Sequence, residues 1–336
     1  MPKKGQRKPP PPLAGDPSDA LGFAALLAEY LSMLRSRNYS EATVKGRTYY
    51  LSFFAHWCAE RALTRPCEVT KPLLERYQRF LYAYRGRGGH PLSFRSQGAH
   101  LVPVRALFKW LCRQNYLLSN PASDLDLPRV EHRLPKHVLS ASEVEQVLAQ
   151  ADTSDPVGLR DRAMMEVFYS TGMRRLELLH LKRYDLDAER GTVLIRQGKG
   201  KKDRMVPLGT RAFSWVGKYL EEARPRLAGG GPDDGTVFLS NAGLPLATDY
   251  VSELVRGYID RAEIGKRGSC HLFRHTCATL MLEGGADIRF IQQLLGHANV
   301  NTTQVYTQVS IRQLQEVHAR THPARATAVP APAADV

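Results

Sequence analysis

Apolar residues recur at spacings of three and four through the first third of the chain, a pattern typical of helices that bury one face. Short polar or glycine-rich joints separate these runs, so a small all-α bundle is the simplest packing. Ser40 is suited to cap the second helix, and Pro103 is expected to kink or start the fourth. The pattern predicts four helices, over 21–34, 40–62, 71–84 and 101–114.

A second series of elements begins after residue 139. Ser140 and Glu143 form a capping box that opens a new helix. Two strand-like runs, 192–196 and 203–208, flank a turn rich in glycine and lysine and predict a β-hairpin, to which 237–239 is expected to add an edge. Helical periodicity accounts for most of the remainder, over 157–169, 175–181, 210–227, 248–262, 271–283, 287–295 and 301–318. The predicted fold class is therefore mainly α with a small β-sheet.

Three segments lack a sustained apolar period. Residues 1–19 are rich in proline and lysine and predict a disordered basic arm, whereas 323–336 predicts a flexible tail. Residues 119–139 carry prolines and alternating charge, as a domain linker does. The remaining chain divides into a helical domain, 20–118, and an α+β domain, 140–322.

The net charge of the chain indicates which class of molecule it binds. The chain of 336 residues has 47 basic and 33 acidic side chains, a formal net charge of +14, which favours nucleic acid as partner. Charges interrupt every long apolar run, and no apolar core of a signal peptide follows the basic start, so we expect a cytoplasmic protein without membrane contact. The five cysteines are odd in number and scattered, which is typical of free thiols.

Common cofactor motifs do not fit. The segment 198–202 lacks the spacing and the terminal Ser or Thr of a phosphate-binding P-loop. No cluster of acidic residues suits paired divalent ions, and Cys270 and Cys277 beside His271 and His275 match no usual zinc spacing. We therefore expect chemistry without a metal or another cofactor.

One ordered series in the second domain suits phosphodiester cleavage. Two arginines can grip the non-bridging oxygens of a phosphate, and a lysine can protonate the leaving oxygen. A histidine can accept the proton of a tyrosine whose oxygen attacks phosphorus, and the resulting covalent ester stores the bond energy without ATP. The candidate catalytic residues are Arg174, Lys199, His271, Arg274, His297 and Tyr306.

These residues, in this order, resemble the tyrosine recombinase (phage integrase) family, and among its members the bacterial Xer type. Three motifs carry the resemblance: His-Leu-Phe-Arg-His at 271–275, Leu-Leu-Gly-His at 294–297 and Thr-Thr-Gln-Val-Tyr at 302–306. It covers roughly 21–322. It implies a helical, SAM-like core-binding domain followed by the family's catalytic domain, and a site-specific recombinase or integrase as the function.

The resemblance implies a role for each matching residue. Arg174 and Arg274 would clamp the scissile phosphate, while Tyr306 forms a 3′-phosphotyrosine bond and releases a 5′-hydroxyl. Lys199 would be the general acid. The attacking 5′-hydroxyl of a partner strand would then reverse the ester and join DNA.

Three further positions take supporting roles by the same resemblance. His271 would be the general base or a donor to the phosphate, and His297 a hydrogen-bonding partner. Glu177 would support the arginine and the histidine.

DNA contacts and assembly are also implied. The family forms a clamp around duplex DNA, and its members act as cyclic tetramers on paired inverted sites. The segment 310–318 would dock onto a neighbouring protomer. Whether a second recombinase or an accessory protein takes part stays open. Candidate contacts to the DNA backbone are Arg35, Arg37, Lys45 and Arg47 in the first domain and Lys201, Lys202 and Arg204 in the hairpin.

Simpler readings exist for each feature alone. Arg174 and Glu177 are spaced as a surface helical ion pair, the histidines and Tyr306 suit ordinary packing, and the basic residues suit a solvated face. Two other functions remain as alternatives: a type IB topoisomerase, and a DNA-binding architectural protein that does not cut. Arg175 departs from the smaller or apolar residue of many relatives. Between Xer-like resolution and a mobile-element integrase, we lean towards the integrase.

Overall fold

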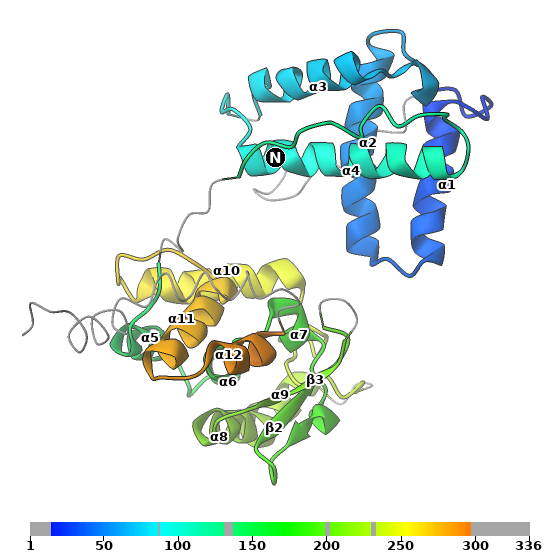
Figure 1. Cartoon of the computed structure of the whole chain (residues 1–336). Coiled ribbons are helices and arrows are strands. Elements are labelled where there is room, and N and C mark those ends of the chain that lie inside the picture. Colours follow the sequence, from blue (N-terminus) through cyan, green and yellow to red (C-terminus); the bar gives the residue numbers. More distant parts are fainter. Residues whose placement is uncertain (1–14, 87, 131–136, 199–201, 230–232, 297–336) are drawn as a thin grey trace, which may run out of the picture. The chain divides into compact units, whose positions relative to one another are not determined.

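A computed structural model describes residues 15–86, 88–130, 137–198, 202–229 and 233–296 (Figure 1). The chain divides between residues 132 and 133 into two compact units. We call the described residues before this point the first unit and those after it the second unit. Helices dominate both units, and the second unit carries a small antiparallel sheet, as the sequence predicted.

The first unit contains the four predicted α-helices. Ser40 caps the second of them, because its side chain accepts a hydrogen bond from the backbone N–H of Thr43 at 3.3 Å. The apolar faces meet around Phe54, whose ring lies 4.9 Å from that of Tyr77. The elements are α1 Phe23–Ser36, α2 Glu41–Ala59, the 3₁₀ turn η1 Pro66–Glu68, α3 Lys71–Ala83 and α4 Phe94–Arg113.

The fourth helix begins earlier than predicted. Ser93 caps it by accepting a hydrogen bond from the N–H of Ser96 at 3.1 Å. Pro103 therefore does not start α4 but lies buried inside it. The cap and the apolar face of α4, which includes Leu107 and Leu111, outweigh the one backbone hydrogen bond that a proline cannot make.

Parts of the predicted arm and linker are packed. Asp19, which the sequence placed in the disordered arm, accepts a hydrogen bond from Nε of Arg65 at 2.7 Å. Ala122 and Leu125, placed in the linker, are buried in the core of the first unit, and Leu139 is buried in the second. Residues 1–14, 131–136 and the tail from 323 lie outside the described residues.

The second unit begins with the predicted capping box. Glu143 accepts a hydrogen bond from the N–H of Ser140 at 2.6 Å, and Ser140 Oγ accepts one from the N–H of Glu143 at 3.2 Å. No helix in either unit, as far as the structure describes them, is both long and apolar enough to cross a membrane. The elements are α5 Ala141–Leu148, α6 Pro156–Thr171, α7 Arg175–Leu179, η2 Arg183–Asp185, β1 Leu186–Asp187, β2 Thr192–Ile195, β3 Arg204–Pro207, α8 Thr210–Lys218, the π-helical turn η3 Tyr219–Ala223, α9 Arg224–Ala228, α10 Thr248–Arg261, α11 Cys270–Glu283 and α12 Ile288–Leu295.

The sheet has the order β1-β2-β3 and is antiparallel throughout. The hairpin of β2 and β3 was predicted, whereas β1 was not. The expectation that 237–239 adds an edge strand was wrong. The buried Arg224 donates hydrogen bonds to the carbonyls of Thr236 and Val237, which takes up backbone groups that a sheet would need.

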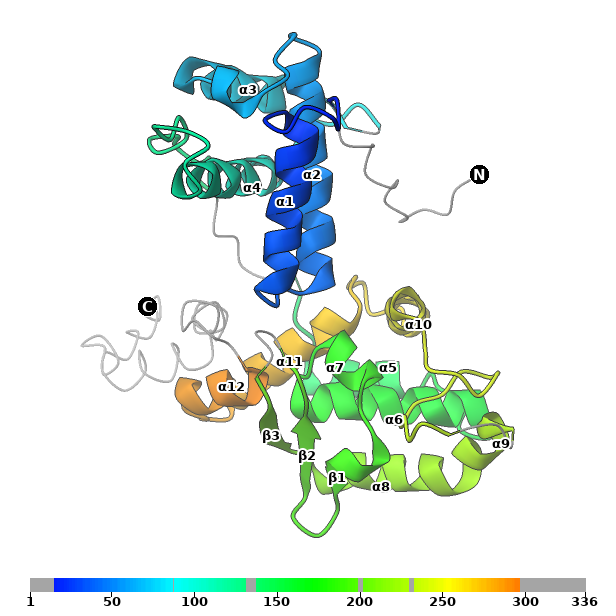
Figure 2. The ribbon, with the colours of Figure 1, turned by 90° about the vertical axis from the view of Figure 1, so that its right-hand side faces the viewer.

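The long helix α6 forms the middle of the second unit. It contacts α8 on one side and α11 on another, and Figure 2 shows it between them. A small apolar cluster that includes Ala278 and Ile291 packs α12 against α11. Through these contacts, the C-terminal ends of α6 and α12 are brought close to the start of α7.

Candidate active site

The junction of α6 and α7 is built on a glycine. Gly172 ends α6 in the left-handed conformation, with φ 58°, and a Cβ at this position would lie 2.7 Å from a methyl carbon of Leu295. The position therefore requires glycine both for its backbone angle and for the close approach of α12. Two residues later, Arg174 is the N-cap residue of α7, so the contact places Arg174 beside the end of α12.

The guanidinium of Arg174 is held by two acceptors. Nη1 donates to Oε1 of Glu177 at 2.8 Å, and Nη2 donates to the carbonyl of Gly296 at 3.0 Å. The side chain is still 23% exposed. It is therefore both fixed and open to a ligand.

Arg274 lies 100 residues later in the chain, on α11, and reaches the same place. Its Nη1 donates to the carbonyl of Gly172 at 2.6 Å, and its Nη2 donates to the carbonyl of Leu295 at 2.7 Å. The residue is only 7% exposed. Arg274 thus joins the ends of α6 and α12.

A third arginine completes the cluster. Arg204, the first residue of β3, donates from Nη1 and Nη2 to the two carboxylate oxygens of Glu177 at 2.9 and 2.7 Å and from Nε to the carbonyl of Leu294 at 3.2 Å. The carbonyls of 294–296 therefore each accept a hydrogen bond from a different arginine. The last carbonyls of a helix lack partners within the helix and carry partial negative charge, which explains why they gather cations.

The sequence also placed Arg204 among the contacts to the DNA backbone, and that contact stays a prediction. Its side chain is 14% exposed and is paired with Glu177. Arg204 and the buried Val206 lie two residues apart on β3 and so share a face of the strand. This spacing was the signal in the sequence for an inward-facing arginine.

Glu177 is ionised at neutral pH. Burial alone would raise the pKa of its carboxyl group, but hydrogen bonds from Arg204 and from the backbone and side chain of Arg174 outweigh it and lower the pKa to about 2. One carboxylate therefore orients two arginines. The predicted support of Arg174 by Glu177 is present as direct contacts.

His271 lies in the first turn of α11, one turn before Arg274, and is exposed. Desolvation, together with the positive charges of Arg274, Arg175 and Arg174, lowers the pKa of its imidazole. The ring is thus neutral at pH 7 and able to accept a proton. Arg175 itself donates a hydrogen bond to Ser252 on α10.

Four predicted site residues lie outside the described residues: Lys199, Lys201, His297 and Tyr306. The structure describes a residue next to each of Lys199, Lys201 and His297. The N–H of Gly198 donates to the carbonyl of Lys202 at 3.0 Å, and Lys202 is exposed. Among the described side chains, no group of three or more His, Cys, Asp or Glu is arranged to hold a metal ion.

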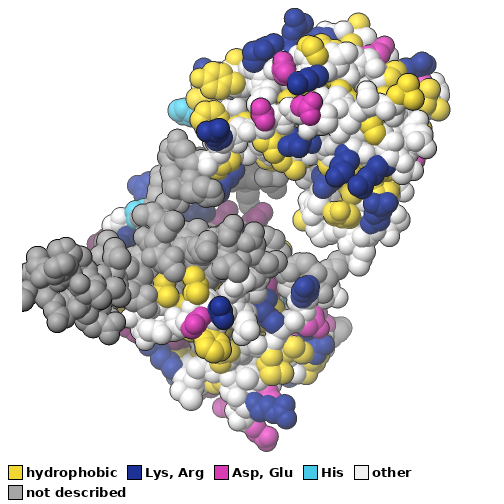
Figure 3. Space-filling view, viewed as in Figure 1, with side chains coloured by type: hydrophobic (Ala, Val, Ile, Leu, Met, Phe, Trp, Pro, Cys, Tyr) yellow, Lys and Arg dark blue, Asp and Glu magenta, His cyan; other side chains and the backbone are white. Residues whose placement is uncertain are grey.

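The basic residues of the first unit are of two kinds. Arg35, Arg37 and Lys45 are exposed, and Figure 3 shows basic side chains close together over the end of α1 and the start of α2. Arg47 instead donates a hydrogen bond to the hydroxyl of Tyr30 and lies over the ring of Tyr30. Contact of these four residues with DNA stays a prediction.

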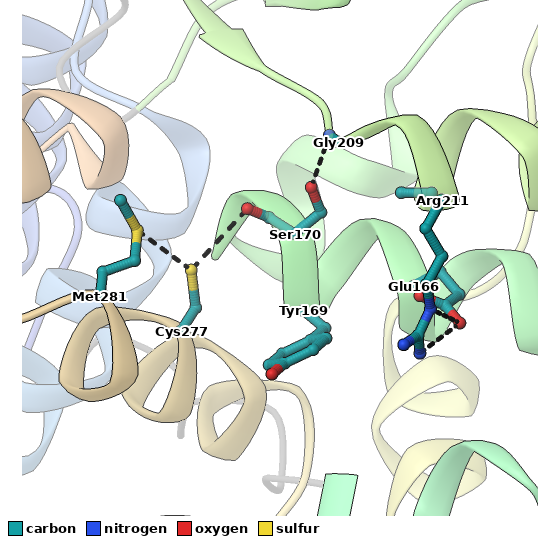
Figure 4. A pocket seen from close by; sticks show the side chains of 8 residues that line it. Glu166, Tyr169, Ser170, Gly209, Arg211, Cys277 and Met281 are labelled. Carbon is teal, nitrogen blue, oxygen red and sulfur yellow. Dashed lines mark hydrogen bonds and ion pairs between the residues drawn. The ribbon is translucent and has the colours of Figure 1, made fainter. Parts of the chain in front are cut away.

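A separate pocket of about 270 Å³ lies between α6, α8 and α11 (Figure 4). Arg211 and Glu166 form an ion pair of 2.8 Å at one side, and Cys277 and Met281 line the other. Burial raises the pKa of the Cys277 thiol to about 12, so it is not a nucleophile at neutral pH. Among the described residues of the predicted catalytic set, neither Arg174, His271 nor Arg274 lines this pocket.

Comparison with known proteins identifies the architecture. The model of the Phage integrase family matches residues 137–312, just over half of the chain. The chain belongs to this family. The recombinase is 47% identical over 312 residues to Tyrosine recombinase XerC 2 of Ralstonia nicotianae, a match that covers 93% of this chain and 89% of the relative.

Two further matches agree. Tyrosine recombinase XerD of Listeria monocytogenes is 36% identical over 300 residues, covering 89% of this recombinase and 98% of the relative. The solved XerH site-specific recombinase, bound to a palindromic difH substrate in a post-cleavage complex, is 25% identical with a TM-score of 0.68 and covers 87% of this chain and 83% of that one. The predicted resemblance to Xer-type tyrosine recombinases is confirmed.

Proposed function

We propose that this recombinase cleaves and rejoins duplex DNA at specific sites through a 3′-phosphotyrosine bond to Tyr306, without a metal ion or ATP. The observation that supports this most is the arginine cluster. Arg174 and Arg274 are distant in sequence, yet both are fixed at the end of α12, directly before the segment that leads to Tyr306. Preorganised donors of this kind stabilise charge that develops in a transition state.

The reaction exchanges one phosphate ester for another. The side chains of Arg174 and Arg274 bind the non-bridging oxygens of the scissile phosphate. The hydroxyl oxygen of Tyr306 bonds to phosphorus while the bond from phosphorus to the 5′-oxygen breaks. His271 accepts the tyrosine proton, and Lys199 gives a proton to the 5′-oxygen. In the reverse step a 5′-hydroxyl attacks phosphorus, and both protons return.

The proposed substrate is double-stranded DNA with paired inverted core sites. The palindromic substrate bound by XerH supports inverted sites, and the net charge of +14 supports a polyanionic partner. We propose a homo-tetramer on DNA, in which 310–318 docks onto the neighbouring protomer. The matches along nearly the full length of two Xer recombinases favour Xer-like recombination over the mobile-element integrase to which the sequence alone inclined.

A covalent-complex assay tests the proposed chemistry. A duplex site is first selected from random DNA with Tyr306→Phe, and a nick is then placed so that the 5′-hydroxyl fragment is lost on cleavage. The wild type should give a protein–DNA band on a denaturing gel that survives chelator, and Tyr306→Phe should give none. Tyr82→Phe, which changes an exposed tyrosine on α3, is the matched control. A band that persists in Tyr306→Phe, or no band from the wild type on DNA that it binds, would contradict the proposal.

Strand exchange separates the alternatives. The proposed activity joins strands from two differently labelled duplexes. A topoisomerase would relax supercoiled DNA and restore only the original strand, and an architectural protein would do neither.

A further inference from the structure

The side chain of Arg204 joins three segments of the second unit. Arg204 itself lies at the start of β3, directly after the hairpin loop. It binds both oxygens of Glu177, on α7, and the carbonyl of Leu294, on α12. All three nitrogens of its guanidinium thus have an acceptor, and each acceptor belongs to a part of the arginine cluster.

Two glycines make room for this side chain. A Cβ on Gly198 would lie 2.9 Å from Nη1 of Arg204, and a Cβ on Gly296 would lie 2.9 Å from its Cζ and Nε. Gly296 also has a left-handed φ of 63°, whereas for Gly198 the close approach alone calls for glycine. Gly198 directly precedes Lys199, and Gly296 directly precedes His297. The Arg204 guanidinium therefore lies against the backbone of both segments that lead into these residues.

We infer that Arg204 is a positioning residue for strand cleavage: it holds the hairpin segment that leads into Lys199 at a fixed place relative to Glu177 and Arg174. The inference rests on the proposed function, in which Lys199 is the general acid. In this inference Arg204 acts through other groups, because every nitrogen of its guanidinium already has an acceptor in the protein. Without it, the hairpin keeps its strands but loses the side chain that ties its loop to the arginine cluster.

The inference makes a chemical prediction that a general loss of folding does not. A 5′-oxygen leaving group needs a proton, so its departure depends on the general acid. A 5′-sulfur leaves as a stable thiolate without one, because a thiol is far more acidic than an alcohol. Replacing the bridging 5′-oxygen of the scissile phosphate by sulfur should therefore compensate for a misplaced Lys199.

The experiment compares single-turnover cleavage of the two substrates by Arg204→Met. A misplacement of about 1 Å can cost about 100-fold in rate, so cleavage of the oxygen substrate should fall about 100-fold, and most of that loss should be absent on the sulfur substrate. If Arg204 acts only through other groups, the dissociation constant for DNA should stay within about threefold of the wild-type value. Gly198→Ala, which keeps the charge of Arg204 and displaces its guanidinium, should show the same pattern to a smaller extent.

Three controls make the result specific. The cleavage rate of Lys199→Ala should recover on the sulfur substrate, whereas that of Arg274→Lys should not. Arg196→Met is the control variant, because Arg196 directly follows β2 and pairs with the buried carboxylate of Asp185 at 2.6 Å rather than with Glu177. It loses an ion pair to a buried carboxylate and should cleave both substrates at the wild-type rate.

Two outcomes would overturn the inference while the wild type still cleaves DNA. One is an Arg204→Met variant that cleaves both substrates at the wild-type rate. The other is an equal loss on both substrates, which would mean that Arg204 supports the fold or Arg174 rather than the general acid. Failure of the wild type to form a covalent complex with either substrate would overturn the proposed function and the inference with it.

Discussion

The basic side chains of the two units are held in different ways. In the second unit, Arg174, Arg204 and Arg274 each donate to at least two acceptors, and little of each is exposed. In the first unit, Arg35 has one ion pair, with Glu41 at 3.2 Å, and its side chain is 53% exposed. Arginine therefore serves as a fixed group in the cluster of the second unit and, at Arg35, as an exposed surface charge in the first.

This difference separates two physical roles. A fixed guanidinium needs no reorganisation when charge develops on a phosphate, and in a partly buried site its interaction is weakly screened. An exposed cation near DNA acts mainly by releasing counterions, and its effect is spread over many contacts and falls with salt. The cluster should therefore control the rate of cleavage, and the first unit should control affinity.

The largest effect is expected at Arg274. Arg274→Lys keeps the charge but cannot span the carbonyls of Gly172 and Leu295 together, so cleavage should fall about 100- to 1,000-fold. DNA affinity should change little. Single-turnover cleavage and equilibrium binding measured on the same duplex check both statements. An equal loss in DNA affinity would contradict the statement that the cluster controls the rate of cleavage and the first unit controls affinity.

The next effect concerns stability. Glu177→Gln leaves two partly buried arginines without their shared carboxylate and should lower the free energy of unfolding by about 3 kcal/mol at pH 7. Because the pKa of Glu177 is lowered to about 2, its contribution is complete above pH 4.5 and is lost as the pH falls towards 2. Thermal denaturation of both proteins at pH 7 and pH 3 should therefore show a difference that shrinks at the lower pH. An unchanged difference would mean that the carboxylate charge is not what stabilises the cluster.

Arg37 tests the other side of the comparison. Arg37→Ala should weaken DNA binding about fivefold at physiological salt and make the dependence of log affinity on log salt shallower by about 0.9 for one lost phosphate contact. Cleavage at saturating protein should be unchanged. Titrations at several salt concentrations provide the slope, and an unaltered slope would remove Arg37 from the DNA-binding surface.

The smallest effect concerns the pH profile. Since the pKa of His271 is lowered, cleavage that uses it as a base should persist below pH 6.5 and decline only at more acidic pH. Arg175→Leu removes one of the charges that lower this pKa. The decline of the cleavage rate on the acidic side of the pH profile should therefore move up towards pH 6.5. The rate at pH 6 should fall by no more than about fourfold, with no change at pH 8. A decline at the same pH as in the wild type would show that Arg175 does not affect the pKa of His271.

Local signals were sufficient for much of the fold. Ser40 and the pair of Ser140 and Glu143 cap helices through neighbours within three residues, so the sequence reveals them directly. The start of α4 was missed because Pro103 is a strong local signal that tertiary packing overrides. The expected edge strand at 237–239 was wrong for a similar reason, since the buried Arg224 and Arg160 bind the carbonyls of Val237 and Leu239.

In the candidate site, too, local sequence signals reveal some features and tertiary packing decides the others. The order of motifs indicated Arg174, Glu177 and Arg274, but their arrangement depends on contacts over long sequence distances, such as that between Arg174 and Gly296. Arg204 was placed near DNA, together with the hairpin lysines, by the family resemblance. The local sequence did not reveal its pairing with Glu177, which lies on another element 27 residues away.

The most direct test of the central claim replaces one non-bridging oxygen of the scissile phosphate by a methyl group, which removes its negative charge. If the fixed guanidinium of Arg274 acts on that charge, the loss in cleavage rate caused by Arg274→Ala should be at least about tenfold smaller on the methylphosphonate than on the phosphate. Arg37→Ala should show the same small effect on both substrates. An equal loss for Arg274→Ala on the two substrates would contradict the account, because the guanidinium would then act on something other than the phosphate charge.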